Sequence, residues 1–117
     1  MGIIAEQWLL DERVHLSVHR ATGLRRLTGL IGRRELAPAA ALRFARCRSV
    51  HGFGMARTID VLFVDAGGAI TSVRSLAPWR CVADSAAAVV FELRAGEVRR
   101  LQIDAGSQIR QLTEGEQ

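Results

Sequence analysis

Apolar residues occupy both faces of one stretch of the chain, whereas most other apolar runs alternate with polar residues. Ile59–Val64 is interrupted only by Asp60, and β-branched and aromatic residues of this kind pack well in a buried strand. The next four residues, Asp65 to Gly68, favour a tight turn, because glycine tolerates positive φ and an Asp side chain bonds to the backbone two residues on. The pattern predicts a hairpin of Ile59–Val64 with Ala69–Leu76, which a second layer of structure must cover.

Shorter periodic segments surround this hairpin. Residues 13–20 alternate, with Val14, Leu16 and Val18 on one side, which predicts a half-buried antiparallel strand. Residues 22–31 change to a helical period and predict one short helix. Further strands are predicted at residues 40–48, at residues 89–93 and around residues 109–112, and a helical turn or strand at residues 98–103.

These elements make up one domain with a mainly β fold. With 117 residues and 49% apolar composition, the chain is long enough for a single hydrophobic core. Short strands about ten residues apart, together with one short helix, are typical of a compact antiparallel β-sandwich or a partly open barrel. We expect residues 1–12 to form a lead-in segment and residues 113–117 a frayed tail.

The sequence has no segment of the kind that crosses a membrane. A transmembrane helix needs about 18 consecutive apolar residues, and no such run is present. Glu6, Asp11 and Glu12 argue against a signal peptide. We therefore expect a cytoplasmic protein without membrane association. In that compartment the two cysteines, Cys47 and Cys81, are expected to be reduced, buried thiols.

The charge excess of the chain is smaller than its isoelectric point suggests. The formal net charge is +4, but the pI is near 10.8, because the sixteen basic residues are all arginine, which titrates at very high pH. Composition alone therefore gives weak support for nucleic-acid binding. The densest basic run, formed by Arg43, Arg46 and Arg48, is the alternative candidate site, a face for an anionic polymer such as nucleic acid.

Several spaced motifs follow one another between residues 13 and 110. They are GLIGRREL at residues 29–36, FGM at residues 53–55, TIDVLFVD at residues 58–65 with Gly68, Pro78 with Cys81, VFELRAG at residues 90–96, and Ala105 with Gly106. This series resembles the DUF192 family of uncharacterised proteins. The resemblance implies a distorted antiparallel β-sandwich with one short helix, and it implies no activity. The chain departs from the family pattern at Gly54, where the family has Trp, and at Ser107, where it has Asp.

The main candidate site lies in the loops around the central strand. A glycine-rich loop, residues 51–55, lets a ligand approach the backbone closely. We expect a shallow site for a small ligand or peptide, with His51 as the polar contact and Asp60 as the anchor. Met55 and Trp79 would form apolar walls, with Cys81 beside them. In the competing structural interpretation, Met55 fills the core, Asp60 holds a turn and His51 is solvated.

Two chemical alternatives use the same histidine and cysteines. Cys47 and His51 have a spacing that could bind zinc, with Cys81 or His15 as further ligands, but the sequence has no Cys-x-x-Cys pair. Cys81 could act as a nucleophile with His51 as its base, but no local motif supports this chemistry. We therefore predict a binding module rather than an enzyme, with no catalytic residue, metal or cofactor assigned.

The sequence leaves two modes of partner binding open. Single-strand nucleic-acid binders stack bases on aromatic side chains. This chain has no Tyr, and its four Phe mostly fall at inward positions, which leaves Trp8 and Trp79 as platforms. A protein-interaction module would instead pair an exposed sheet edge with a partner or a second copy, with Trp8 to Leu10 as a docking segment. The oligomeric state stays open between a monomer and a homodimer.

Overall fold

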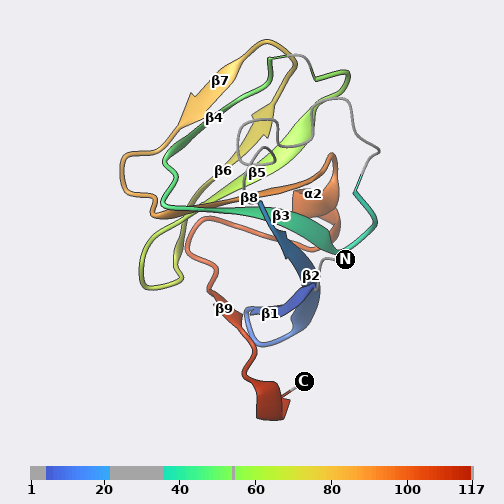
Figure 1. Ribbon diagram of the computed structural model, residues 1–117, viewed down its shortest axis with the longest axis vertical. Coiled ribbons are helices and arrows are strands. Elements are labelled where there is room, and N and C mark those ends of the chain that lie inside the picture. The colour runs from blue at the N-terminus through green and yellow to red at the C-terminus, as the bar shows by residue number, and fades with distance from the viewer. Residues whose placement is uncertain (1–4, 22–35, 54, 117) are drawn as a thin grey trace.

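The computed structural model describes residues 5–21, 36–53 and 55–116, which form two β-sheets and one short helix (Figure 1). The elements are β1 (Glu6–Leu10), β2 (Val14–Arg20), β3 (Ala40–Ala45), β4 (Ser49–His51), β5 (Ile59–Val64), β6 (Ile70–Leu76), β7 (Cys81–Ala83), β8 (Val89–Arg94), α2 (Glu97–Arg100) and β9 (Ile109–Gln111). The larger sheet has the order β6-β5-β8-β3-β2-β1-β9, and β4 pairs with β7 separately. The mainly β prediction is therefore confirmed. In this part of the chain, no helix has the length and apolar character to span a membrane.

The predicted central hairpin is confirmed. β5 pairs antiparallel with β6 on one side and with β8 on the other, so it is an interior strand. A bulge between Phe63 and Val64 shifts the register next to the turn. Asp65 holds the turn, because its Oδ1 accepts hydrogen bonds from the N–H groups of Gly67 and Ala69, at 2.9 Å each.

One strand pair departs from the antiparallel prediction. β2 and β3 run parallel, with Ser17 opposite Ala40. A parallel pair needs a long crossover connection, and residues 21–39 separate these two strands. The alternation of apolar residues is the same for either direction of pairing, so it could not reveal this pair. The helix predicted at residues 22–31 lies outside the described residues.

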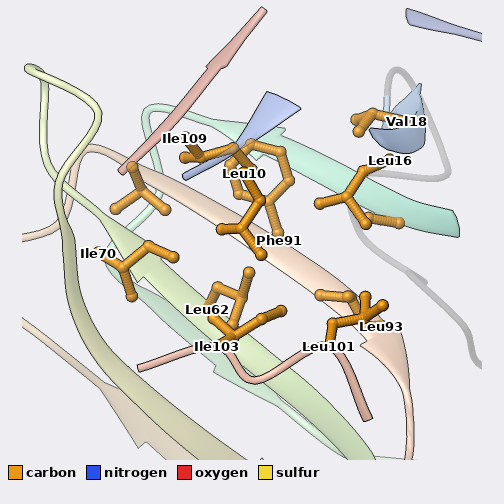
Figure 2. Close-up of a cluster of buried hydrophobic side chains, with 12 residues drawn as sticks. Leu10, Leu16, Val18, Leu62, Ile70, Phe91, Leu93, Leu101, Ile103 and Ile109 are labelled. Atoms are coloured by element: carbon orange, nitrogen blue, oxygen red, sulfur yellow. The ribbon is translucent and has the colours of Figure 1, made fainter. Parts of the chain in front are cut away.

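The larger sheet buries side chains on both faces. In β5, Leu62 and Val64 belong to a cluster on one face, and Val61 and Phe63 to a cluster on the other. All four are at most 2% exposed, which explains why this strand lacks polar alternation. The first core cluster (Figure 2) is Leu10, Leu16, Val18, Ala41, Leu62, Val64, Ile70, Phe91, Leu93, Leu101, Ile103 and Ile109. The second core cluster is Ala21, Leu42, Phe44, Val50, Met55, Ile59, Val61, Phe63, Leu76, Ala87 and Val90.

Different elements cover the two faces of the sheet. Leu101 and Ile103, which follow α2, and Ile109 of β9 lie in the first core cluster (Figure 2). Val50 of β4 lies in the second core cluster, and Val82 of β7 packs against it. Full burial of a large apolar side chain stabilises the fold by about 1.5–3 kcal/mol. The apolar face of the small sheet therefore attaches it to the core, and its other face remains exposed.

Within the predicted lead-in segment, residues 6–10 form a strand of the larger sheet. β1 pairs with β2 on one side and with β9 on the other, and Leu10 is fully buried. Trp8 packs edge-on against Phe91, with ring centroids 5.1 Å apart and an interplanar angle of 76°. The residues expected to dock at a sheet edge are therefore occupied within the chain.

The C-terminal residues are tied back to β9. Glu114–Glu116 form a 3-10 turn, and Arg110 donates to the Glu116 carboxylate at 2.9 Å. Glu116 also accepts a hydrogen bond from the Thr113 N–H at 2.9 Å. The segment predicted to fray thus contains a short hydrogen-bonded turn.

Both cysteines are free thiols. Cys47 is half-buried and donates to the carbonyl of Ser49 at 3.1 Å. Cys81 is exposed, so the prediction of a buried thiol is wrong at this position. The physical reason is that β7 is buried on one face alone, and Cys81 alternates with the inward Val82.

Candidate functional site

β4 and β7 present one face to the core and the other to solvent. Val50 pairs with Val82, and these two side chains contribute to the apolar inner face. His51 pairs with Cys81 at the next position, and both residues are exposed. Figure 1 shows the two strands at one end of the long axis of the molecule, with β9 and the C-terminal turn at the other. The outer face of β4 and β7 is therefore distant from the C-terminus.

Gly52 joins two loops, one that follows β4 and one that precedes β7. Its N–H donates to the carbonyl of Arg80 at 2.8 Å, and its own carbonyl accepts from the N–H groups of Trp79 and Met55 at 2.8 and 3.2 Å. A Cβ atom at residue 52 would lie 2.6 Å from the carbonyl oxygen of Ala77. Only glycine fits this close approach without a backbone shift. Gly52 therefore allows the two loops to lie side by side.

Three aromatic rings line these loops and form what we call the aromatic surface: His51, Phe53 and Trp79. The His51 and Phe53 centroids are 4.6 Å apart, and Phe53 stacks on Trp79 at 5.9 Å with an interplanar angle of 29°. Phe53 is 48% and Trp79 69% exposed. Contiguous apolar surface left in water is typical of a binding site rather than of the remainder of a fold.

The backbone of Trp79 adds a second unusual feature. Its φ is +65°, in the left-handed region that bulky L-residues rarely occupy. Such a conformation costs about 1–3 kcal/mol and persists where the surroundings enforce it, often at functional sites. The hydrogen bond from the Trp79 N–H to Gly52 helps to enforce it here. The large ring is thus held outward by the backbone.

His51 and Cys81 face each other across the small sheet. The bond between Gly52 and Arg80 lies one residue beyond this pair, which places His51 and Cys81 at a non-hydrogen-bonded position of the ladder. Side chains at such positions have Cβ atoms about 4.5–5.5 Å apart. In the described residues no hydrogen bond joins the imidazole to the thiol, so the contact between base and nucleophile that cysteine catalysis uses is not formed.

The zinc hypothesis finds no group of ligands in the part of the chain that the structure describes. No three His, Cys, Asp or Glu side chains there lie together in a metal-binding arrangement. A closed structural zinc site needs four ligands. His51 and Cys81 are adjacent, but Cys47 bonds to Ser49 near the start of β4 instead.

The other two predicted site residues lie elsewhere. Met55 is 6% exposed and belongs to the second core cluster, beneath the loop rather than beside a ligand. Asp60 points to the opposite face of the larger sheet, because its neighbours Ile59 and Val61 both face the second core cluster. There Asp60 Oδ2 accepts from the N–H of Gly96 at 3.1 Å and of Val98 at 2.9 Å. Asp60 therefore holds the turn that begins α2.

Phe53 is the member of the site that sequence reasoning missed. Phe44, Phe63 and Phe91 are all buried, in agreement with the expectation for the phenylalanines as a group. Phe53 differs because it lies between two glycines and outside any alternating strand. Glycine neighbours provide no side chains to cover a ring, and that signal could have identified Phe53 as exposed.

The predicted basic run is not a continuous face. Arg43 is drawn inward, where its guanidinium bonds to both carboxylate oxygens of Glu6 at 3.0 Å and lies 5.6 Å from the Trp8 ring centroid. Burial alone would raise the pKa of Glu6, but the hydrogen bonds from Arg43 and Trp8 outweigh it and lower that pKa. Arg46 and Arg48 are exposed. The run therefore divides into an internal pair and an exposed end.

Charge is distributed unevenly along the chain. Residues 36–59 and 66–83, which include β3, β4, β6 and β7, contain no Asp or Glu. Of the twelve acidic residues, four precede residue 36 and four follow residue 96. The elements around the aromatic surface are thus purely basic in sequence. Their arginines are Arg43, Arg46, Arg48, Arg57, Arg74 and Arg80.

One buried carboxyl group has no hydrogen-bond partner at one oxygen. Glu92, in the middle of β8, is 4% exposed, and its Oε1 has no hydrogen-bond partner within residues 5–21, 36–53 and 55–116. It pairs with Leu42 and Val61, two members of the second core cluster. Burial raises the pKa of this carboxyl group to about 7. Sequence reasoning treated Glu92 only as part of a motif.

Comparison with solved structures identifies similar folds. The crystal structure of a "putative transcription regulator" from Sinorhizobium meliloti 1021 has a TM-score of 0.81 and 26% identity, covering 95% of this chain and 96% of that one. A protein of unknown function from Novosphingobium aromaticivorans DSM 12444 has a TM-score of 0.78 and 19% identity, covering 92% and 84%. The second likeness concerns the fold alone.

Comparison of sequences identifies the family. A UPF0127 protein of Pyrococcus abyssi is 35% identical over 66 residues, a match that spans 56% of this chain and 56% of that relative. The sequence profile of DUF192, described as "Uncharacterized ACR", matches residues 10–111. That range includes eight of the nine strands in full, together with the aromatic surface. The chain therefore belongs to the DUF192 family.

Proposed function

We propose that this protein is a non-catalytic β binding module that takes a small ligand or a peptide at the aromatic surface. The observation that carries the proposal is the exposed stack of Phe53 on Trp79, with His51 alongside. Covering a large aromatic side chain contributes about 1.5–3 kcal/mol. Two such rings side by side therefore provide enough driving force for a specific contact of modest size.

The loops that carry these rings are prepared for binding. Three backbone hydrogen bonds converge on Gly52 and fix the positions of both loops. A surface that is already ordered loses less conformational entropy when it binds. The proposed ligand presents a planar or apolar group to the rings, and His51 supplies the polar contact. Binding is favoured over catalysis because, in the described part of the chain, no base is bonded to the exposed thiol of Cys81.

A second candidate function is the binding of an anionic polymer. The uneven charge favours it, because the segments around the aromatic surface contain arginine and no acidic residue. The similar Sinorhizobium meliloti protein, described as a "putative transcription regulator", gives further support. Arg43 has no part in this candidate site, because it is paired with Glu6.

The compartment we propose is the cytoplasm. The support is chemical, because both cysteines are free thiols and an exposed thiol such as Cys81 persists in a reducing environment. Alkylation of intact cells followed by mass spectrometry should find Cys81 modified as a free thiol. Recovery of Cys81 in a mixed disulfide would contradict the proposal.

Saturation-transfer NMR with a panel of small aromatic compounds and proline- or tryptophan-containing peptides tests the proposed function. We expect compounds that bind the wild-type chain to lose their signal with Trp79→Ala. They should keep it with the matched control Trp8→Phe, because Trp8 packs against Phe91 away from the aromatic surface. Equal signals from the wild type and Trp79→Ala for every compound would overturn the proposal.

A further inference from the structure

We infer that the ligand of the aromatic surface is single-stranded nucleic acid, with bases stacked on the rings and phosphates held by arginines of the adjoining segments. This inference rests on the binding role proposed for the aromatic surface, and it takes the anionic polymer of the second candidate function as the ligand in place of a small ligand or peptide. It replaces the predicted Arg43, Arg46 and Arg48 face, because Arg43 is engaged with Glu6. Three features of the site support this ligand: the rings, the charges and the shape.

The rings are suited to planar ligands. One side of Trp79 stacks on Phe53, and the residue as a whole is 69% exposed. A base can therefore extend the stack that His51, Phe53 and Trp79 already form. Stacking of this kind is worth roughly a tenfold or larger gain in affinity per base, and it tolerates any base because every base has a π-face.

The charges select an anionic partner. Arg48 precedes β4 and Arg80 lies between Trp79 and β7, and both are exposed. The nearest acidic residue along the chain, Asp84, accepts hydrogen bonds from Thr71 and Ser72 at 2.7 and 2.6 Å. These hydrogen bonds lower the pKa of Asp84, so its carboxylate keeps its negative charge and is held toward Thr71 and Ser72 of β6. Arginine next to exposed aromatic rings is the combination that single-strand binders use for backbone and bases together.

The shape of the site favours a single strand. His51 lies on the outer face of a two-stranded sheet whose strands have three residues each, and Phe53 and Trp79 lie in the loops beside it. Bases in a duplex are stacked on one another and expose only their edges, whereas an unpaired strand can turn a base face toward a protein ring. An acidic peptide would satisfy the arginines but not supply the planar groups. Single-stranded nucleic acid satisfies both.

Fluorescence anisotropy with a fluorescein-labelled oligothymidylate of about twelve nucleotides tests the inference on the full chain, at about 50 and about 200 mM salt. Trp79→Ala and Phe53→Ala should each reduce the affinity about tenfold or more. Arg80→Gln should weaken binding and reduce the slope of log affinity against log salt by about 0.7. The matched control is Arg99→Gln, an exposed arginine in α2, whose loss should change the affinity less than about twofold. Thermal melts check that each variant is folded.

Several outcomes would overturn the inference. These are failure of the wild type to bind, equal affinity for the wild type and Trp79→Ala, or equal losses from Arg80→Gln and Arg99→Gln. Competition by polyglutamate as strong as by unlabelled oligonucleotide would show a site for any anion. Competition by thymidine monophosphate at equal nucleotide concentration would show a mononucleotide site instead.

The two proposals fail separately. If the oligonucleotide does not bind but the small aromatic compounds still depend on Trp79, only the nucleic-acid inference is wrong. If those compounds also bind equally to Trp79→Ala, the proposed function is wrong as well.

Discussion

Glu92 is a buried ionisable residue, and its Oε1 has no hydrogen-bond partner among the residues that the structure describes. Burial raises the pKa of its carboxyl group to about 7, from an ordinary value of 4.5. The folded state therefore holds the proton more tightly than the unfolded state. The resulting stability is fully present below pH 4.5 and is lost as the pH rises through 7. The total loss is at most about 3 kcal/mol, since one pKa unit corresponds to about 1.4 kcal/mol.

Replacing Glu92 by Gln removes this dependence. We expect Glu92→Gln to increase the free energy of unfolding at pH 8 by about 1–3 kcal/mol and to change it much less at pH 5. Urea denaturation of both proteins at the two pH values measures the effect. Stabilisation of the same size at both values would contradict this account of the carboxyl group.

Glu97 shows the opposite shift: its pKa is lowered, so the free energy of unfolding decreases at low pH. Hydrogen bonds from Arg100 at 2.6 and 2.7 Å, against the effect of its burial, lower the pKa of Glu97 to about 2. Its contribution is present above pH 4.5 and is lost as the pH falls toward 2. The comparison between pH 5 and pH 8 therefore lies above the range in which Glu97 titrates.

At the level of elements, the turn between β5 and β6 provides two adjacent glycines with different constraints. Gly68 has a φ of +89°, and a Cβ atom there would lie 2.6 Å from the carbonyl oxygen of Ile109. Gly67 would meet only Asp65 Oδ1, at an ordinary 3.5 Å. We expect Gly68→Ala to cost about 2 kcal/mol or more and Gly67→Ala less than about 1 kcal/mol, measured by urea denaturation. Equal costs would contradict this description of the turn.

Element-level prediction from the sequence was most successful where a pattern was strong. Continuous apolar character in Ile59–Val64 identified a strand buried on both faces, and Asp65 to Gly68 identified its turn. The parallel pairing of β2 with β3 was not predictable, because apolar alternation records which face is buried and not the direction of the neighbour. The helix predicted at residues 22–31 remains a prediction, since it lies outside the described residues.

Prediction of the site succeeded only in part, for a similar reason. Met55 and Asp60 were grouped with the exposed residues because they lie in the loops and the strand that the DUF192 pattern emphasises. One step along a strand reverses the face of a side chain, so Asp60 reaches α2 instead. The glycines beside Phe53 were a local signal of ring exposure, but the position of the ring is set by contacts of Gly52 that are distant in the sequence.

For the whole molecule, β1 joins the edge strand β9 to the rest of the large sheet. It pairs with β2 and with β9, and among the described strands β1 is the one neighbour of β9 in the sheet. We expect a chain lacking residues 1–12 to lose cooperative unfolding or to melt at least about 10 °C lower, because Trp8 and Leu10 leave the first face uncovered. Circular dichroism melts measure this. A truncated chain with unchanged melting temperature and altered mass by light scattering would instead support a docking role for the segment.

The most direct measurement of the central claim uses the two indole N–H signals of the protein in ¹⁵N–¹H NMR spectra. Trp8 Nε1 donates to Glu6 at 3.0 Å beside Phe91, and Trp79 is exposed on the aromatic surface, so one signal reports the site and the other is an internal control. Titration with the aromatic compounds, the peptides and the oligothymidylate should shift the Trp79 signal in a saturable manner and leave the Trp8 signal unchanged. The account is contradicted if no ligand shifts the Trp79 signal, or if bound ligands shift Trp8 and leave Trp79 unchanged.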